Sequence, residues 1–286
     1  MYDSWLTHFY PDLLGELDAR CARGPLDYAW LRDVDEDLWT ILLGKEYGVY
    51  PNLREALPDL PAADVQETWN GRSGAALATQ SSAFYRKLKQ LQARHGGVPI
   101  ADATVLDFGC GWGRLIRFLA RDVAPERLCG CDPYPRILGV CEQTRVPGRL
   151  EPIAYVSDTL PFADRFDLVY AFSVFTHLAE DTHLACLRAI HAGLDEGGLL
   201  ITTIRPPAYV ALQPGLPRSP RKLERDRPAY AFAAHDVQPS GGEVTYGEAV
   251  INLPYVRERW GELFELLEVS LLLDDMYQVV LTLRRR

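Results

Sequence analysis

The chain has 286 residues, of which 48% are hydrophobic, and its formal net charge at pH 7 is -9. This length can bury one large α/β core with a modest accessory region. The negative charge repels a phosphate backbone and so disfavours a nucleic-acid partner. The sequence has no apolar run of membrane-spanning length and no signal-peptide pattern at its start, so we expect a cytoplasmic protein without a membrane partner. The cysteines form no Cys-x-x-Cys pair, and we expect no metal and no disulfide.

Residues 1–100 have helical patterning, and we interpret them as a helical N-terminal cap or lid. A proline-rich break at 51–61 separates the first helices from a second helical run at 82–94.

Residues 101–286 are expected to form the main domain. From 101 to 205, short apolar strands alternate with helices, which is typical of a parallel sheet with helices on both faces. Residues 206–242 are rich in proline and charge, and we interpret them as an insertion that covers the substrate. The sequence after residue 242 predicts, in order, a strand at 244–251, a helix at 254–264, and two strands at 266–272 and 277–283.

The first strand of this domain runs directly into glycines at alternate positions, Gly109, Gly111 and Gly113. Glycines at such a turn let a ligand approach the backbone at the carboxyl end of the strand. A dinucleotide-binding loop would place its third glycine where Arg114 stands. Asp107, at the end of the strand, would repel a pyrophosphate but can receive an ammonium group. The pattern therefore favours a cofactor that carries an amino-acid moiety.

Asp107 followed by these alternate glycines resembles motif I of the class I S-adenosylmethionine-dependent methyltransferases. The resemblance lies mainly in residues 101–205, and the last two predicted strands fit the hairpin that closes the sheet of that family. It implies S-adenosylmethionine as the cofactor. It also implies a doubly wound, mostly parallel seven-stranded sheet with an antiparallel last strand, a helical N-terminal cap and an insertion after the fifth strand.

A second strand, at 127–131, ends at Asp132, about twenty residues after the glycine loop. An acidic residue there can accept hydrogen bonds from both ribose hydroxyls of a nucleoside. NAD-dependent enzymes also use an acidic residue at this position. Asp132 therefore supports a nucleotide-binding site but does not distinguish which nucleotide is bound. Cys110 in the loop and Pro133 after Asp132 belong to the same predicted site.

The resemblance implies contacts to the adenine ring as well. A strand expected at 152–156 is followed by Asp158, which would hold the adenine amino group, with Thr159 and Leu160 beside the ring. At the other end of the cofactor, Ser173, after a fourth strand at 166–172, would line the methionine moiety. Two residues of the cap would touch the methionine carboxylate, namely Arg72 and Tyr85.

Methyl transfer from a sulfonium is a direct displacement, in which proximity and desolvation do most of the work. A hydroxyl acceptor must still lose its proton, and a positioned general base is worth about 10²–10⁴ in rate. His177 lies just past the fourth strand, facing the crevice where open α/β sheets bind ligands, and is the first candidate base. The alternative interpretation is that His177 lies at the start of a helix and that its ring hydrogen-bonds to the backbone. His235, in the insertion, is the rival candidate.

We therefore predict an enzyme that transfers the methyl group of S-adenosylmethionine to a small-molecule acceptor, with a hydroxyl oxygen favoured over nitrogen. Basic residues around the insertion either receive an anionic or carrier-bound acceptor or form a solvated loop; they are Arg205, Arg218, Arg221, Lys222, Arg225 and Arg227. A monomer and a homodimer both fit the sequence.

Two alternatives remain open. The first is an NAD(P)-dependent reductase or epimerase, which would carry a Tyr-x-x-x-Lys pair on one helix face. Tyr85 has its lysines at other spacings, at Lys87 and Lys89. The second is a non-catalytic methyltransferase-like partner protein, which the intact glycines and acidic residues argue against.

Overall fold

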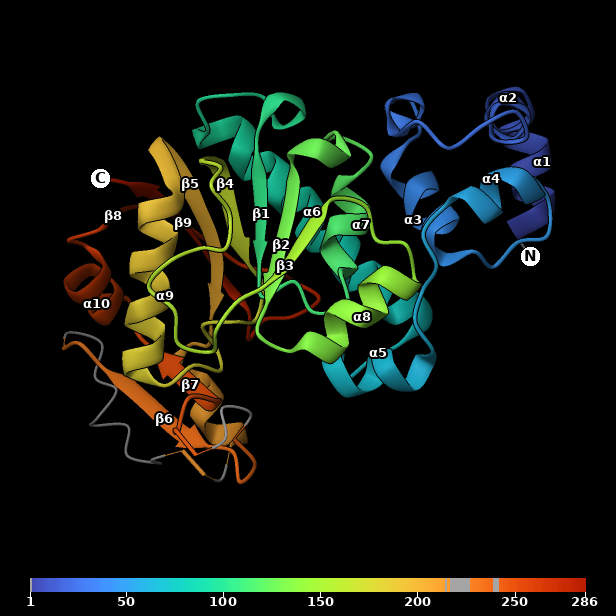
Figure 1. The fold of residues 1–286 in the computed structure, drawn as a ribbon. Coiled ribbons are helices and arrows are strands. Elements are labelled where there is room, and N and C mark those ends of the chain that lie inside the picture. The colour runs from blue at the N-terminus through green and yellow to red at the C-terminus, as the bar shows by residue number, and fades with distance from the viewer. Residues whose placement is uncertain (1, 214, 217–226, 239–241) are drawn as a thin grey trace.

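The computed structural model describes residues 2–213, 215–216, 227–238 and 242–286 of the chain. Its centre is a seven-stranded sheet with the strand order β3-β2-β1-β4-β5-β9-β8 (Figure 1). Five neighbouring strands run parallel: β1 (Val105–Phe108), β2 (Leu128–Asp132), β3 (Arg149–Pro152), β4 (Phe166–Ala171) and β5 (Leu194–Ile204). The last strand, β9 (Val279–Arg285), is antiparallel to both of its neighbours, β5 and β8 (Phe264–Ser270). The predicted mostly parallel sheet with an antiparallel last strand is confirmed.

The central strands are buried on both faces, because successive side chains of a strand point to opposite sides of a sheet. In β1, Val105 belongs to the core on one face, and Leu106 and Phe108 belong to the core on the other. Side chains from α3 (Glu36–Gly44), α6 (Gly74–His95) and α7 (Arg114–Leu119) fill the first core. Side chains from α9 (Glu180–Gly193), α10 (Leu253–Tyr255) and the π-helix Val256–Trp260 fill the second.

Further α-helices are α1 (Tyr2–Phe9), α2 (Pro11–Cys21), α4 (Pro51–Ala56), α5 (Ala63–Asn70) and α8 (Pro135–Gln143). Short 3-10 turns lie at Tyr28–Leu31, Ile100–Asp102, Pro125–Arg127 and Pro207–Leu212. The group formed by α1, α2 and α4 stands to one side of the sheet in Figure 1. Among the described residues, no helix combines the length and the apolar character that crossing a membrane requires.

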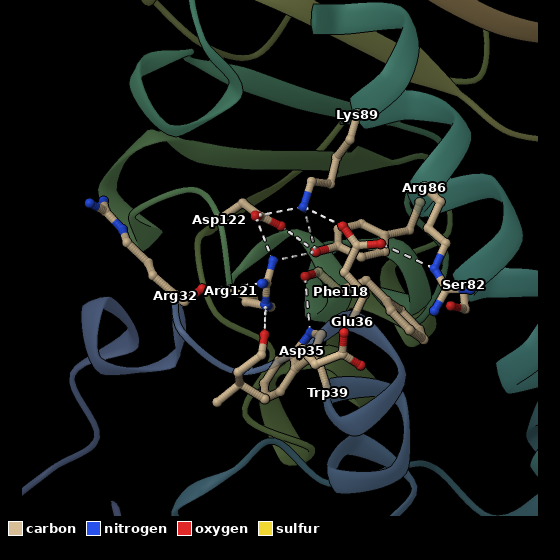
Figure 2. A network of polar contacts seen from close by, with 12 residues as sticks. Arg32, Asp35, Glu36, Trp39, Ser82, Arg86, Lys89, Phe118, Arg121 and Asp122 are labelled. Atoms are coloured by element: carbon tan, nitrogen blue, oxygen red, sulfur yellow. Dashed lines mark hydrogen bonds and ion pairs between the residues drawn. The ribbon is translucent and has the colours of Figure 1, made fainter. Parts of the chain in front are cut away.

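A polar network joins the N-terminal helices to the sheet domain. Lys89 of α6 lies between the carboxylates of Glu36 in α3 and Asp122 after α7, at 2.6 and 2.9 Å (Figure 2). Arg121 pairs with Asp122 at 2.8 Å, and the indole of Trp39 donates to the carbonyl of Phe118 at 3.1 Å. These groups are mostly shielded from water, so they are screened less than surface ion pairs and fix α3 and α6 against α7.

The predicted strand at 244–251 lies outside the main sheet. It is shorter, as β7 (Gly247–Ile251), and pairs with β6 (Tyr230–Ala234) in a separate two-stranded antiparallel sheet. The hairpin has its own apolar contacts, which include Ala231 and Val250. Residues 230–234 show little alternation between polar and apolar side chains. The sequence alone therefore did not predict this strand, which forms by pairing with β7.

Other elements differ from the sequence expectations at their ends. Helix α6 begins at Gly74, eight residues before the predicted start, and the proline-rich break contains α4, which starts at Pro51. Proline is tolerated in the first turn of a helix because its missing N–H would be unpaired there anyway. Strand β3 ends at Pro152, where the prediction placed its beginning.

His183 of α9 is a buried histidine without polar contacts. Its ring packs against Phe175, Tyr230 and Trp260, and neither ring nitrogen has a hydrogen-bond partner among the described residues. Burial lowers the pKa of His183 from 6.5 to about 3. The pKa is lower in the folded than in the unfolded state, so the folded state loses stability as the pH falls below 6.5.

We expect His183→Phe to remove this acid sensitivity while keeping a ring in the same space. Between pH 8 and pH 5, the stability of the variant relative to the unchanged protein should rise by about 2 kcal/mol, because only the unchanged protein must keep a histidine neutral at this buried position. Urea unfolding at both pH values measures this difference. A difference that stayed constant with pH would show that His183 is protonated in the folded state.

Candidate active site

A cavity of about 570 Å³ lies at the carboxyl ends of the parallel strands. Its floor includes the ends of β1, β2 and β4, and residues of α5 and the segment before β7 also line it. In Figure 1, α5 and the β6–β7 hairpin both lie beyond this edge of the sheet. Lining residues include Trp69, Asp107, Gly109, Cys110, Gly111, Arg114, Asp132, Pro133, Tyr134, Tyr155, Phe172, Ser173, His177, Arg205, Tyr246, Asp275 and Gln278. The volume suits a drug-sized ligand, for which pockets are typically about 300–1,000 Å³.

The glycine loop forms one wall of the cavity. The backbone N–H groups of Gly109 and Cys110 both donate to the carbonyl of Cys131, at 2.8 and 3.0 Å, so the loop is anchored to the end of β2. Gly109 has a φ of 78°, and a Cβ there would lie 2.5 Å from a methyl of Val174. Only glycine fits this position, because both the backbone conformation and the space exclude a side chain.

Asp132 is 5% exposed and sits at the end of β2 beside the loop. Its two carboxylate oxygens accept from the backbone N–H groups of Gly111 and Tyr134, both at 2.9 Å. Burial raises the pKa of Asp132 to about 6 in spite of these hydrogen bonds. The carboxylate is thus held in place by the backbone while it faces the cavity, where it can accept further hydrogen bonds.

Asp107, at 3% exposure, is more deeply buried. Burial raises its pKa to about 7, and the positive charge of Arg114 acts in the opposite direction. A cation bound in the cavity would favour the ionised form of this carboxylate. Cys110 lines the same wall, and the neighbouring thiol of Cys141 together with burial raises the pKa of the Cys110 thiol well above the usual value, so Cys110 acts as an apolar part of the wall.

Ser173 lies at a sharp turn after β4 and has a φ of 61°, which is uncommon for a residue with a side chain. The turn is held by the Ser173 N–H, which donates to Thr203, and by the Ser173 hydroxyl, which accepts from Gln278 at 2.8 Å. The structure therefore brings Ser173, Pro133, Cys110 and the acidic residues of the loop to one cavity.

The structure does not place the three residues predicted to contact adenine at this cavity. Asp158 and Thr159 are exposed, and Leu160 packs against the helix end at Gly193, so none of the three lines the cavity. The physical reason is the early end of β3, at Pro152, which leaves Asp158 well along the following loop. Tyr134 and Tyr155 line the cavity near Asp132 in their place.

The two cap residues predicted at the methionine carboxylate also lie elsewhere. Arg72 is exposed in the turn between α5 and α6, although its neighbours Trp69 and Asn70 line the cavity. Tyr85 is 1% exposed, and its hydroxyl donates to Asp122 in the network that joins the cap to α7. Tyr85 is thus committed to holding the helices together.

Of the two candidate bases, only His177 lines the cavity. Its Nδ1 lies 2.8 Å from the carbonyl of Gly247, which assigns the proton to Nδ1 and leaves Nε2 as an acceptor, 3.3 Å from the guanidinium of Arg205. Burial and the charge of Arg205 lower the pKa of His177 to about 3. The ring is therefore neutral, and the lone pair on its Nε2 already faces a hydrogen-bond donor, the guanidinium of Arg205.

His235 lies next to His177, at the protein surface and outside the cavity. Its Nε2 is 3.2 Å from the carboxylate of Glu248, which also pairs with Arg205. Three potential metal ligands meet here, His177, His235 and Glu248, but the guanidinium of Arg205 supplies the positive charge at this point. Of the basic residues in the insertion, Arg218, Arg221, Lys222 and Arg225 fall outside the described residues.

Several cavity residues were missed from the sequence. Arg114 carried a signal, since it replaces the third glycine of a dinucleotide loop, but it was used only to exclude that class of protein. Gln80, Asp275 and Gln278 carried none, because they reach the cavity from α6 and from the turn before β9, far away in the sequence. Tyr246 also lines the cavity and stacks on His177 with ring centroids 5.1 Å apart.

The strand order, the antiparallel last strand, and the glycine loop between two acidic strand ends define the class I S-adenosylmethionine-dependent methyltransferase fold. Residues 105–198 match the family model described as a methyltransferase domain. The chain therefore contains a class I methyltransferase domain, and the resemblance seen in the sequence is confirmed.

A curated relative, the ubiquinone biosynthesis O-methyltransferase of Methylobacterium sp. (strain 4-46), is 35% identical over 108 residues, which are 36% of this chain and 41% of the relative. The chain thus matches less than half of that protein. Two solved structures share the fold. The magnesium protoporphyrin IX methyltransferase of Synechocystis PCC 6803, with bound S-adenosylhomocysteine, has a TM-score of 0.51 at 15% identity and covers 78% of this chain and 94% of its own. An amino pentose methyltransferase of Micromonospora echinaspora has a TM-score of 0.52 at 16% identity and covers 80% and 99%.

Proposed function

We propose that the protein transfers the methyl group of S-adenosylmethionine to a hydroxyl oxygen of a small-molecule acceptor. One observation carries the proposal: a single cavity joins the glycine loop, Asp107 and Asp132, and extends past them to Ser173 and His177. The first three features suit a nucleoside with a cationic amino-acid group. The remaining space offers a place for an acceptor next to it.

The residues present fit the cofactor. Gly109 leaves no room for a Cβ and Gly111 has a φ of 53°, so both loop positions favour glycine, and Asp132 can accept from the ribose hydroxyls. Asp107 provides the negative charge for the ammonium group. The two solved relatives of the same fold were crystallised with S-adenosylmethionine or S-adenosylhomocysteine, which supports this assignment.

The helical residues 1–100 act in this proposal as a lid. Trp69 of α5 approaches Tyr134 with ring centroids 5.7 Å apart, and the indole of Trp112 donates to Asn70 at 2.8 Å, so α5 closes over the glycine loop. A closed site excludes water and keeps the acceptor close to the cofactor. The oxygen acceptor is supported by the O-methyltransferase relative.

When bound, S-adenosylmethionine supplies an electrophilic methyl group on a sulfonium. An acceptor oxygen would bond to this methyl carbon as the carbon–sulfur bond breaks, the electron pair would stay on sulfur, and the hydroxyl proton would be released to bulk water once the products leave the closed site. The chain contributes by holding the two reactants in line. His177 is poorly matched to take the proton, because efficient general bases have pKa values near the operating pH and that of His177 is about 3.

We therefore expect His177→Gln, which keeps a hydrogen-bonding side chain, to retain turnover within about tenfold, whereas loss of a true general base costs about 10²–10⁴. Turnover is followed as S-adenosylhomocysteine release with the first acceptor that a screen of hydroxylated compounds identifies. A fall of a hundredfold or more would restore His177 as the base. His235→Ala, outside the cavity, is the matched control.

The cofactor is tested by calorimetric titration with S-adenosylhomocysteine, with NAD as the parallel ligand. Micromolar binding of the former without binding of the latter supports the proposal. Binding of NAD alone would favour a reductase instead, and binding of neither would indicate a non-catalytic protein.

A further inference from the structure

The guanidinium of Arg114 is a buried positive charge that faces the cavity without a carboxylate partner. The residue is 7% exposed, at the start of α7, and lines the cavity. Within the part of the chain that the structure describes, no carboxylate oxygen lies within 4.0 Å of it. Buried charges in proteins are normally paired, since an unpaired one costs several kcal/mol.

Among the described residues, Arg114 makes its side-chain hydrogen bonds through one nitrogen. Nη1 donates to the side-chain oxygens of Gln80 and Ser81, at 3.0 and 3.1 Å. A guanidinium has five N–H donors, so those on Nε and Nη2 remain for another partner. The ring of Phe172, whose centroid lies 5.0 Å from Cζ, supports the guanidinium from one side.

The nearest acidic residues are kept apart from Arg114. Gln80 accepts from Arg114 with its oxygen and donates to Asp275 with its nitrogen, at 2.9 Å, and so stands between the two charges. Asp107 acts on Arg114 only through the longer-range attraction of their charges. The arrangement keeps a fork of donors open at the cavity instead of closing it with an internal ion pair.

Asp107 and Arg114 lie at the two ends of the glycine loop, at the end of β1 and the start of α7. One loop thus presents a carboxylate and a guanidinium to the same cavity. A zwitterionic amino-acid group carries the complementary ammonium and carboxylate. Arg–carboxylate pairs are commonly bidentate, which gives both strength and orientation.

We propose that Arg114 binds the carboxylate of the cofactor's methionine moiety while Asp107 receives its ammonium group, so that the loop selects a zwitterion. Arg114 is then a positioning residue that sets where the sulfur and its methyl group lie. The inference rests on the proposed function and assigns to Arg114 the role that the sequence resemblance gave to Arg72 and Tyr85.

The test compares S-adenosylhomocysteine with its decarboxylated analogue, which keeps the ammonium group, by calorimetry on the full chain. For the unchanged protein we expect removal of the ligand carboxylate to weaken binding by about 10- to 100-fold. In Arg114→Gln the two ligands should bind within about threefold of each other, because the partner of the carboxylate is gone. Arg114→Lys, which keeps the charge without the fork, should lie between them. Arg72→Gln should leave the ratio unchanged.

The ratio of the two ligands' affinities does not depend on the fraction of protein that is folded, so partial unfolding of a variant does not change it. The unchanged protein alone already tests whether the carboxylate of the ligand contributes to binding. Equal binding of the two ligands to the unchanged protein would overturn the inference while leaving the proposed function standing. An unaltered ratio in Arg114→Gln would also overturn it. Binding of neither ligand to the unchanged protein would refute the proposed function and the inference with it.

Discussion

Replacing Asp132 with alanine should weaken S-adenosylhomocysteine binding by about 100-fold. The carboxylate is positioned by two backbone N–H groups and can accept from both ribose hydroxyls. Hydrogen bonds to a charged group contribute about 1.5–3 kcal/mol, so loss of this acceptor amounts to about two orders of magnitude in affinity. The measurement is calorimetric titration at pH 8, above the raised pKa of Asp132, where its carboxylate is ionised.

The control for this prediction is Asp158→Ala. Asp158 was assigned to the adenine amino group from the sequence, but it is exposed and does not line the cavity. Its replacement should leave the affinity unchanged within about twofold. A large loss with Asp158→Ala and none with Asp132→Ala would mean that the nucleoside lies at the outer loop and that the cavity holds something else.

Gly109→Ala should destabilise the protein by about 3 kcal/mol and abolish cofactor binding at micromolar ligand. A left-handed backbone costs a residue with a side chain about 1–2 kcal/mol. The new methyl would also lie 2.5 Å from Val174, and overpacking of this kind costs about 1–3 kcal/mol. Chemical denaturation of the unliganded protein gives the loss in stability, and calorimetry gives the loss in binding.

Two variants separate the causes. Gly109→Ala combined with Val174→Ala should regain the steric part of the loss and keep the backbone part, because the second change removes the methyl groups in the way. Gly139→Ala, in the middle of α8 with nothing within 4 Å of the added methyl, should be neutral or stabilising by up to about 1 kcal/mol. A single Gly109→Ala variant as stable as Gly139→Ala would show that the loop can relax.

Local patterns in the sequence were sufficient for the class of fold. The apolar strand ending at Asp107, the glycines after it, and the second strand ending at Asp132 are all encoded within short windows. Their conformational requirements are local too, since the left-handed backbone of Gly109 suits glycine before any packing is considered. The antiparallel final hairpin was predicted as well, because two strand patterns separated by a short polar turn have few other ways to pair.

Contacts between distant segments could not be predicted in the same way. Asp158 follows a strand in the sequence, but whether it reaches the cavity depends on where β3 stops pairing with β2, which ended at Pro152. Tyr85 looked like a ligand contact on a helical cap. Its role was decided by Asp122, thirty-seven positions away, whose carboxylate takes its hydroxyl.

The sequence by itself determined the fold, the glycine loop and the acidic residues at the ends of the two strands beside it, because these depend on backbone preferences and on spacing within a few residues. Only the tertiary structure decided which side chains share the cavity. It brought Gln80, Arg114 and Asp275 together, neutralised His177 by burying it beside Arg205, and turned Arg72 toward solvent. The physical reason is that burial and charge pairing are properties of the packed molecule, and they set the protonation and reach of a side chain whatever its neighbours in the sequence are.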